Sequence, residues 1–361
     1  MTMPRYTSNA ETPWTTKPFV PCAPVSPKEV PTRLRDELAG PGVKNIADMD
    51  RDWTFASLLK PMQHHWDNGV AIFPFERRSS GLVANQTYFD HPEWCSRYLR
   101  YVHRSPTFRA RWARATGPWS GKVVIDVGCG PGNVAACLEQ KAKLLVGVDL
   151  SRGALQSAAQ FGYTPVHADA QDLPFQSHCA DIVIANAVLH HCDDMAKTLS
   201  EAARLVRLNG VLVTDHDPQL SAYNFKGMGL ALWKWRLAPY RLMKVGFHGS
   251  LAEQTIALAS EIHHNPGDGV TPRFFESVLV PLGFEVRLYP HNHDLGEEVF
   301  SGKWGRSEKK VRIAQMLSGL DPDSRTSALS IMCVATRVRC ESRPPLSGAT
   351  GSSILPSCPA A

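Results

Sequence analysis

Three glycines at alternate positions directly follow an apolar run. The run 123–127 is β-branched apart from Asp126, and Gly128, Gly130 and Gly132 come after it. A run without polar alternation is typical of a strand buried on both faces. Glycines let the backbone turn sharply and approach a ligand without a Cβ in the way. The pattern predicts a buried strand that leads into a nucleotide-binding loop and then a helix.

The glycine spacing limits the choice of nucleotide. The dinucleotide fingerprint G-x-G-x-x-G needs its third glycine at position 133, where this chain has Asn133. The spacing is therefore G-x-G-x-G. This departure disfavours NAD and an oxidoreductase.

Further acids stand at the ends of later strands. Asp149 closes the apolar run 144–149, where a carboxylate can accept hydrogen bonds from both ribose hydroxyls. Asp169 follows a third strand, and Asn186 lies in a fourth. Acids at successive strand ends of an open α/β sheet face one crevice. Asp126 is also explained as a residue that braces the loop, and Asp172 fits a turn better than a ligand.

Three segments together carry a family resemblance. D-V-G-C-G-P-G (126–132), D-A-Q-D-L-P-F (169–175) and L-H-H (189–191) resemble the class I S-adenosylmethionine-dependent methyltransferases of the small-molecule type. The resemblance is strong over 121–215, weak over 271–338 and absent before about residue 120. It implies an α/β, Rossmann-like, doubly wound sheet of seven strands. The sheet is mostly parallel with an antiparallel last strand, and an N-terminal helical cap and a lid insertion are added to it.

The resemblance also implies residue roles around the cofactor S-adenosyl-L-methionine. The loop 128–132 holds the methionine part, and Asp126 orients the loop or binds the amino group. Asp149 holds the ribose, Asp169 and Ala170 read the adenine, and Asn186 lies near the acceptor. The expected cofactor-binding set is Asp126, Gly128, Cys129, Gly130, Gly132, Asp149, Leu150, Asp169, Ala170 and Asn186.

Histidines after the fourth and fifth strands are the candidates for a general base, which is needed only if the acceptor must lose a proton. His190 and His191 follow Asn186, and His216 follows the strand 211–215. We favour His216, oriented by Asp215 or Asp217, although each of the three histidines could instead pack a loop.

Four other histidines, in two pairs, have the side-chain type of a metal ligand. His291 and His293 lie near a strand end without a matching acidic set, so no metal is predicted. His263 and His264 are sufficiently explained as cations at a helix C-terminus.

Composition narrows the class of protein. The net charge of +5 over 361 residues permits an anionic acceptor or a membrane surface but does not indicate nucleic acid. The start lacks the apolar run of a signal peptide, and no stretch is long enough for a membrane-spanning helix. The nine cysteines form no C-x-x-C pair, which favours reduced, buried thiols. These features predict a cytoplasmic protein.

The chain divides by composition into an arm (1–50), an N-terminal helical cap (51–119), a methyltransferase core (120–340) and a tail (341–361). Insertions are expected at 219–270 and, on the surface, at 291–325. In the cap, Asp90 and Glu93 have capping-box spacing for a helix from Pro92. Its Arg97, Arg100 and Arg104 form a solvated basic face or a site for an anionic acceptor. Aromatic residues of the cap either pack or line an acceptor pocket: Trp66, Phe73, Phe75, Tyr88 and Phe89.

The stretch 227–247 mixes tryptophan and leucine with lysine and arginine. It has three interpretations: a lid over the acceptor, a peripheral membrane contact, or a dimer contact. We favour the lid by analogy with this fold, and the oligomeric state stays open.

The sequence predicts methyl transfer to a small organic acceptor, most simply at oxygen. The acceptor is either hydrophobic, such as a polyketide, phenol, quinone or terpenoid, or acidic. A non-catalytic cofactor-binding regulator is the main alternative. A nucleic-acid methyltransferase is disfavoured because Asn186 is not followed by the N-P-P-aromatic segment.

Overall fold

The computed structural model describes residues 53–75, 79–243 and 250–339. They belong to one compact unit, Met49–Ala361; the other unit, Met1–Asp48, lies outside the described residues, as does the expected tail 341–361.

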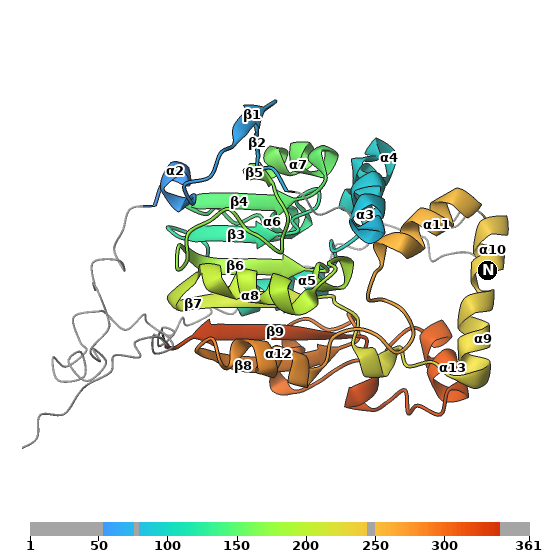
Figure 1. The fold of residues 1–361 in the computed structure, drawn as a ribbon. Helices are drawn as coiled ribbons and strands as arrows, with labels where there is room; N and C mark the ends of the chain where they lie inside the picture. The colour runs from blue at the N-terminus through green and yellow to red at the C-terminus, as the bar shows by residue number, and fades with distance from the viewer. Residues whose placement is uncertain (1–52, 76–78, 244–249, 340–361) are drawn as a thin grey trace, which may run out of the picture. The chain divides into compact units, whose positions relative to one another are not determined.

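The unit is built on one nine-stranded sheet with the order β1-β2-β5-β4-β3-β6-β7-β9-β8 (Figure 1). Strands β3 to β7 run parallel, with their carboxyl ends at one edge. The last strand, β9, lies between β7 and β8 and is antiparallel to both, as predicted. The strands are β1 (His65–Asp67), β2 (Val70–Ile72), β3 (Val123–Val127), β4 (Leu144–Asp149), β5 (Thr164–His167), β6 (Ala180–Asn186), β7 (Val206–Asp215), β8 (Phe284–His291) and β9 (Ser330–Arg337).

The predicted strand number, seven, is wrong by two. The additional strands β1 and β2 extend the sheet beyond β5 and come from a segment expected to be helical. Asn68 and Gly69 connect them with φ values of 48° and 79°. Two successive residues with positive φ are what a tight hairpin turn requires, and Asn-Gly is its commonest sequence. The dipeptide was therefore an available signal.

Helices cover both faces of the sheet. One apolar layer joins Val123, Ile125 and Val127 to α2 (Phe55–Leu58), α8 (Met195–Leu205) and α12 (Pro272–Leu279). The other joins Val124 to α5 (Pro106–Thr116), α6 (Asn133–Leu138) and α7 (Arg152–Ala158). Alternate residues of β3 thus enter opposite layers, as the period of a strand requires.

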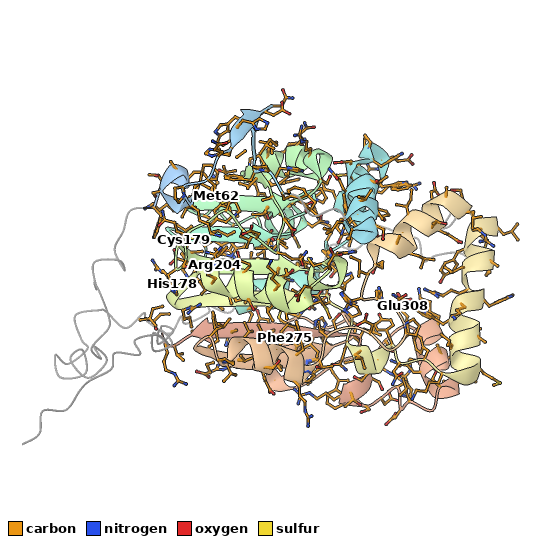
Figure 2. The ribbon with its side chains drawn as sticks, viewed as in Figure 1. Met62, His178, Cys179, Arg204, Phe275 and Glu308 are labelled. Carbon is orange, nitrogen blue, oxygen red and sulfur yellow. The ribbon has the colours of Figure 1, made fainter. Side chains whose placement is uncertain are left out.

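The cap and the insertion lie toward the carboxyl ends of the parallel strands (Figure 1). The cap contains α3 (Ser80–Asp90) and α4 (Pro92–Tyr101), and the insertion contains α9 (Gly227–Trp235), α10 (Leu237–Leu242) and α11 (Leu251–Ser260). Helix α11 packs against α3, and α9 packs against α13 (Lys309–Leu317). Figure 2 shows His178, Cys179 and Arg204 at the opposite end of the sheet, where Arg204 donates to the carbonyls of Leu173 and Phe175.

The segment 291–325, predicted as a surface insertion, contributes to the interior. Val311 and Ala314 of α13 are buried with Ala222, Phe225 and Leu329 in a third apolar cluster. The alternation of charged and apolar residues hid this amphipathic helix in the sequence.

The N-termini of α11, α8 and α4 are capped in different ways. Ser250 and Glu253 form a capping box at the start of α11, and Asp194 caps α8. The box predicted from Asp90 is wrong, because α4 begins after His91 without a side-chain cap. Asp90 is instead the last residue of α3 and accepts hydrogen bonds from the Ser151 hydroxyl and the Gly153 amide of α7.

Two further observations bear on environment. Within the part of the chain that the structure describes, no helix is long and apolar enough to cross a membrane. The described cysteines are all free and buried, as predicted: Cys95, Cys129, Cys137, Cys179, Cys192 and Cys333.

Candidate functional site

A pocket lies at the carboxyl ends of β3, β4 and β6, below the cap helices α3 and α4. It encloses about 750 Å³, part of which is open to solvent. We call it the cofactor pocket, after the cofactor-binding residues that the sequence leads us to expect in it. Its lining includes nine of the ten residues expected to bind a cofactor: Asp126, Gly128, Cys129, Gly130, Asp149, Leu150, Asp169, Ala170 and Asn186.

Gly132, the tenth expected residue, does not line the cofactor pocket. It precedes α6 in a left-handed conformation with φ 92°, where glycine is favoured. A Cβ at this position would approach the Phe161 ring to 3.0 Å and the Cα of Ala158 to 3.2 Å. Gly132 thus allows α6 to start close to its neighbours.

The glycine loop is fixed to the end of β4 by hydrogen bonds. The Gly130 amide donates to Asp149 Oδ2 (2.8 Å), and the Ser151 amide donates to Asp149 Oδ1 (2.9 Å). Burial raises the pKa of Asp149 to about 6, although these amides oppose the shift. At Gly128 (φ 64°), a Cβ would meet the Val188 side chain at 2.5 Å. The loop can take this course only with glycine at 128.

Three oxygen atoms of pocket-lining side chains are buried without a hydrogen-bond partner. They are Asp126 Oδ1, Asn133 Oδ1 and Asn186 Oδ1. Asp126 Oδ2 accepts from the Tyr163 hydroxyl (2.6 Å), and burial raises the pKa of Asp126 to about 7. Buried polar atoms are rarely unpaired. Three such acceptors in one pocket indicate a ligand that brings hydrogen-bond donors.

Asn133 stands where the dinucleotide fingerprint has its third glycine, and its side chain connects two helices. Its amide nitrogen donates to the carbonyls of Tyr98 (3.2 Å) and Val102 (2.7 Å). The side chain therefore joins the start of α6 to the end of α4. Glycine could not make this connection.

The cap supplies the opposite wall of the pocket. Leu82, Asn85 and Phe89 of α3 and Tyr98 of α4 line it. Of the aromatic residues expected there, only Phe89 does so; Trp66 is half exposed, and Phe73 and Tyr88 are buried in packing contacts. Phe75 contacts His167. Leu82, Asn85 and Tyr98 were not expected in this wall, although the helical spacing of 82, 85 and 89 was a usable signal.

The adjacent histidines of the turn Leu189–His191 have different surroundings. His191 lines the cofactor pocket, and its Nδ1 lies 2.6 Å from the Ser260 carbonyl oxygen. His190 does not line the pocket. It contacts Asp217 Oδ1 (2.8 Å) and Glu261 Oε2 (3.4 Å). Burial lowers the pKa of His190, but these two carboxylates outweigh burial and raise it to about 10.

His216, the favoured base, also lies outside the lining of the cofactor pocket. It is close to Asp215 (Nδ1 to Oδ2, 3.2 Å), as expected, whereas Asp217 is the partner of His190. Asp215 is fully buried and also contacts Arg111 (3.0 Å) and His291 (2.7 Å). Burial would raise the pKa of Asp215, but His216, His291 and Arg111 hold it well below its usual range. His216 thus belongs to a buried charge cluster.

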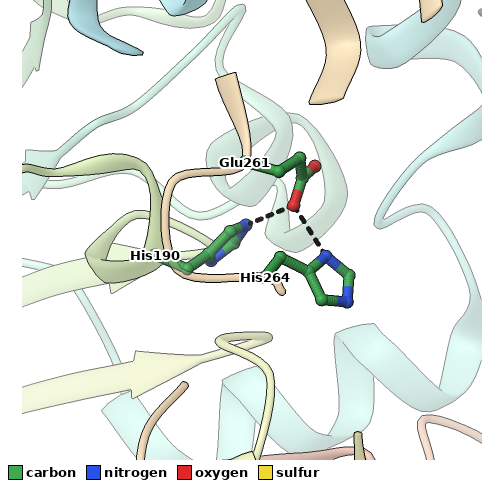
Figure 3. A group of neighbouring side chains, drawn as sticks. All are labelled: His190, Glu261 and His264. Carbon is green, nitrogen blue, oxygen red and sulfur yellow. Dashed lines mark hydrogen bonds and ion pairs between the residues drawn. The ribbon is translucent and has the colours of Figure 1, made fainter. Parts of the chain in front are cut away.

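Two other residues named as possible ligands in the sequence, His293 and Arg97, contact neighbouring side chains. His293 Nε2 lies 2.7 Å from the Ser330 hydroxyl, and the exposed Arg97 pairs with Glu93. Among the described residues of the insertion 219–270, none lines the cofactor pocket. Within the described ranges, one group of side chains has metal-ligand types close together, namely His190, Glu261 and His264 (Figure 3).

Comparisons with known proteins agree on one family. Residues 125–214 match a family described as a methyltransferase domain. The chain is similar to an uncharacterised methyltransferase of Mycobacterium tuberculosis, with 35% identity over 28% of this chain and 55% of that protein. It is also similar to a ubiquinone biosynthesis O-methyltransferase of Thiobacillus denitrificans, with 31% identity over 30% of this chain and 50% of that protein. The chain spans about half the length of these curated relatives.

Among solved structures, the plantazolicin methyltransferase is similar at a TM-score of 0.43 and 17% identity. The likeness covers 72% of this chain and 96% of that one.

Proposed function

We propose that this chain, which belongs to the class I S-adenosylmethionine-dependent methyltransferases, moves a methyl group from that cofactor to a small organic acceptor, most simply at oxygen. One observation carries the proposal. The residues that the family resemblance assigns to the cofactor come from four separate segments, and nine of the ten line one pocket.

The pocket fits the methionine part of the cofactor. The ammonium group of an amino acid donates three hydrogen bonds, and Asp126 Oδ1, Asn133 Oδ1 and Asn186 Oδ1 are buried acceptors without partners. Asp126 supplies the matching negative charge when ionised. We assign these three side chains to the ammonium end, with the glycine loop beside it.

Asp149 and Asp169 are assigned to the nucleoside. Asp149 already accepts two backbone amides, but two carboxylate oxygens offer about four acceptor sites in total. The ribose hydroxyls can therefore bind without breaking the loop. Asp169 Oδ1 accepts the Gln171 amide (2.8 Å), which fixes the turn that would face the adenine with Ala170.

The cofactor supplies an activated methyl group on a sulfonium ion. The protein contributes mainly by position, since holding two reactants in line can supply about 7 to 11 kcal/mol of the barrier. Phe89, Leu82 and Tyr98 give the cap wall an apolar and aromatic surface. Such a wall favours a hydrophobic acceptor and excludes water.

His191 is the residue that we assign to the acceptor's proton. It lines the pocket in the short turn that follows Asn186, and its Nδ1 faces the Ser260 carbonyl. A carbonyl only accepts hydrogen bonds, so Nδ1 carries the hydrogen and Nε2 keeps its lone pair. That lone pair can take the hydrogen of an acceptor hydroxyl. His190 and His216 are then positioning residues.

The insertion also has a surface that suits a peripheral contact with a membrane. Met228 and Trp235 of α9 and Leu242 of α10 are exposed, as is Met243 directly after α10, and Lys234 and Arg241 are adjacent to them in the sequence. Exposed apolar side chains flanked by cations suit the interface of an anionic bilayer. A membrane-associated acceptor would be delivered at this side.

Calorimetric titration with S-adenosylhomocysteine tests the cofactor assignment. We expect saturable binding to the full chain, no binding of NAD, and a loss of affinity of roughly tenfold or more in Asp149→Ala, since removing the ribose contact costs on the order of 1.5 to 3 kcal/mol. Asp172→Ala, an exposed acid nearby, should bind normally. Binding of NAD in place of S-adenosylhomocysteine would refute the proposal.

A further inference from the structure

His190, Glu261 and His264 bring three potential metal-ligand atoms together outside the cofactor pocket. These atoms all lie within 4.8 Å of one another. Glu261 Oε2 is 3.4 Å from His190 Nε2 and 2.7 Å from His264 Nδ1. Figure 3 shows both imidazole rings turned toward this carboxylate oxygen. Both imidazoles therefore converge on Glu261 Oε2.

A second carboxylate orients His190. Asp217 Oδ1 lies 2.8 Å from His190 Nδ1 and also accepts the His190 backbone amide (3.1 Å). These contacts direct Nε2 toward Glu261. A carboxylate on the outer nitrogen is the usual support of a metal-binding histidine, because it fixes the tautomer and the ring.

The backbone fixes the two segments that carry the ligands. His191 Nδ1 lies 2.6 Å from the Ser260 carbonyl, and the His263 amide donates to the His190 carbonyl (2.9 Å). His263 is itself held by Asp268 (2.8 Å). Ile262 packs so closely on α3 that a Cβ at Gly81 would meet its side chain at 2.4 Å. Ligands held in this way are largely preorganised.

The charge of the cluster suits a divalent cation. Asp217 is fully buried, and its Oδ2 has no hydrogen-bond partner. The cation takes the place of the proton that His190 holds between Asp217 and Glu261, so both imidazoles are neutral in the occupied site and the two carboxylates lie beside the ion. Buried charge that is not compensated is costly, and a divalent ion compensates both.

We propose that His190, Glu261 and His264 bind a zinc ion. Two imidazole nitrogens and one carboxylate oxygen are a ligand set that zinc accepts, whereas magnesium and calcium prefer oxygen ligands. Tetrahedral bonds of about 2.0 to 2.2 Å put ligand atoms roughly 3.3 to 3.6 Å apart. The 3.4 Å separation already fits, His264 must move outward from 2.7 Å, and the two imidazole nitrogens start no more than 4.8 Å apart.

The zinc site lies next to a residue of the cofactor pocket, which suits a role in binding the acceptor; this step rests on the proposed function. The rings of His190 and His191 are 4.0 Å apart between centroids, and His191 lines the cofactor pocket. Three protein ligands leave the fourth position of zinc open. That position takes an oxygen or nitrogen atom of the acceptor.

Zinc binding to the untagged full chain tests the site without any activity measurement. After treatment with a chelator, the protein is titrated with zinc chloride against a chromophoric chelator, and its metal content is measured by mass spectrometry. We expect about one zinc per chain. Glu261→Gln and His264→Ala should each weaken binding roughly tenfold or more. His65→Ala and Glu276→Gln, which change exposed side chains elsewhere, should bind as the unmodified chain does.

Measuring the affinity for S-adenosylhomocysteine distinguishes a failure of the zinc site from a failure of the proposed function. If the chelated chain binds S-adenosylhomocysteine but no zinc, or if both ligand variants bind zinc as tightly as the controls, the zinc site is refuted and the proposed function stands. Zinc binding without S-adenosylhomocysteine binding contradicts the proposed function alone. X-ray absorption should show nitrogen and oxygen ligands only, and a sulfur shell at about 2.3 Å would overturn the assignment.

Discussion

Asp126 combines three properties at one position of the cofactor pocket. Its carboxyl group is buried, one of its oxygens is held by Tyr163, and the other has no partner. Burial raises its pKa to about 7, so the free protein holds a proton there near neutral pH. An ammonium group placed beside Asp126 would favour the ionised form and lower this pKa.

Binding of S-adenosylhomocysteine at about pH 6.5 should therefore release a fraction of a proton from Asp126. Calorimetry in two buffers of different ionisation enthalpy measures this release. Asp126→Asn should abolish it, and Asp172→Asn, on an exposed side chain, should leave it unchanged. Proton uptake, or the same release from Asp126→Asn, would show that the ammonium group is not paired with Asp126.

The sequence predicts where a residue lies most readily when chain order determines its position. Asp126, Asp149 and Asn186 end or follow parallel strands, and the carboxyl ends of such strands meet at one edge. Strand order does not predict that Asp217 and Glu261 contact His190. They reach it through the insertion and the turn after β7, whose path depends on packing between distant segments.

At the scale of elements, the buried cluster around Asp215 joins three parts of the fold. Asp215 ends β7, Arg111 belongs to α5, and His291 ends β8. Arg111 also donates to the Leu295 carbonyl (2.6 Å). This cluster holds α5, which leads from the cap to β3, against the end of the sheet.

Arg111→Met should lower the free energy of unfolding by about 3 to 5 kcal/mol, because it removes one partner of a buried ion pair. Urea denaturation measures this change. Arg109→Met is a matched control on the same helix, since its ion pair with Glu139 is exposed and should contribute about 1 kcal/mol or less. Equal losses in the two variants would argue against a structural role for the Asp215 cluster.

The elements themselves were predictable to different degrees. The central strands are continuous apolar runs, and several helices carry cap residues such as Ser151, Asp194 and Thr271. The hairpin of β1 and β2 was missed because each strand has only three residues. A run that short shows no clear period, so the Asn68-Gly69 turn was the main signal.

At the scale of the whole described unit, cofactor and acceptor sites are assigned to different kinds of structure. The cofactor pocket is formed mainly by loops after parallel strands, with the cap above it. The acceptor side adds His191, the cap helices and the insertion that carries Glu261 and His264. The first part follows the parallel sheet and could be predicted, whereas the cap and the insertion lie outside the segments that carry the strong family resemblance.

A methyl-transfer assay tests most directly whether this chain methylates a small organic acceptor. The chain is incubated with S-adenosylmethionine labelled in its methyl group and with a metabolite extract, and the label is followed by mass spectrometry. We expect labelled small molecules with the unmodified chain and none with Asp149→Ala. A chain that binds the cofactor but never passes the label to a small molecule would contradict the account and indicate a regulator.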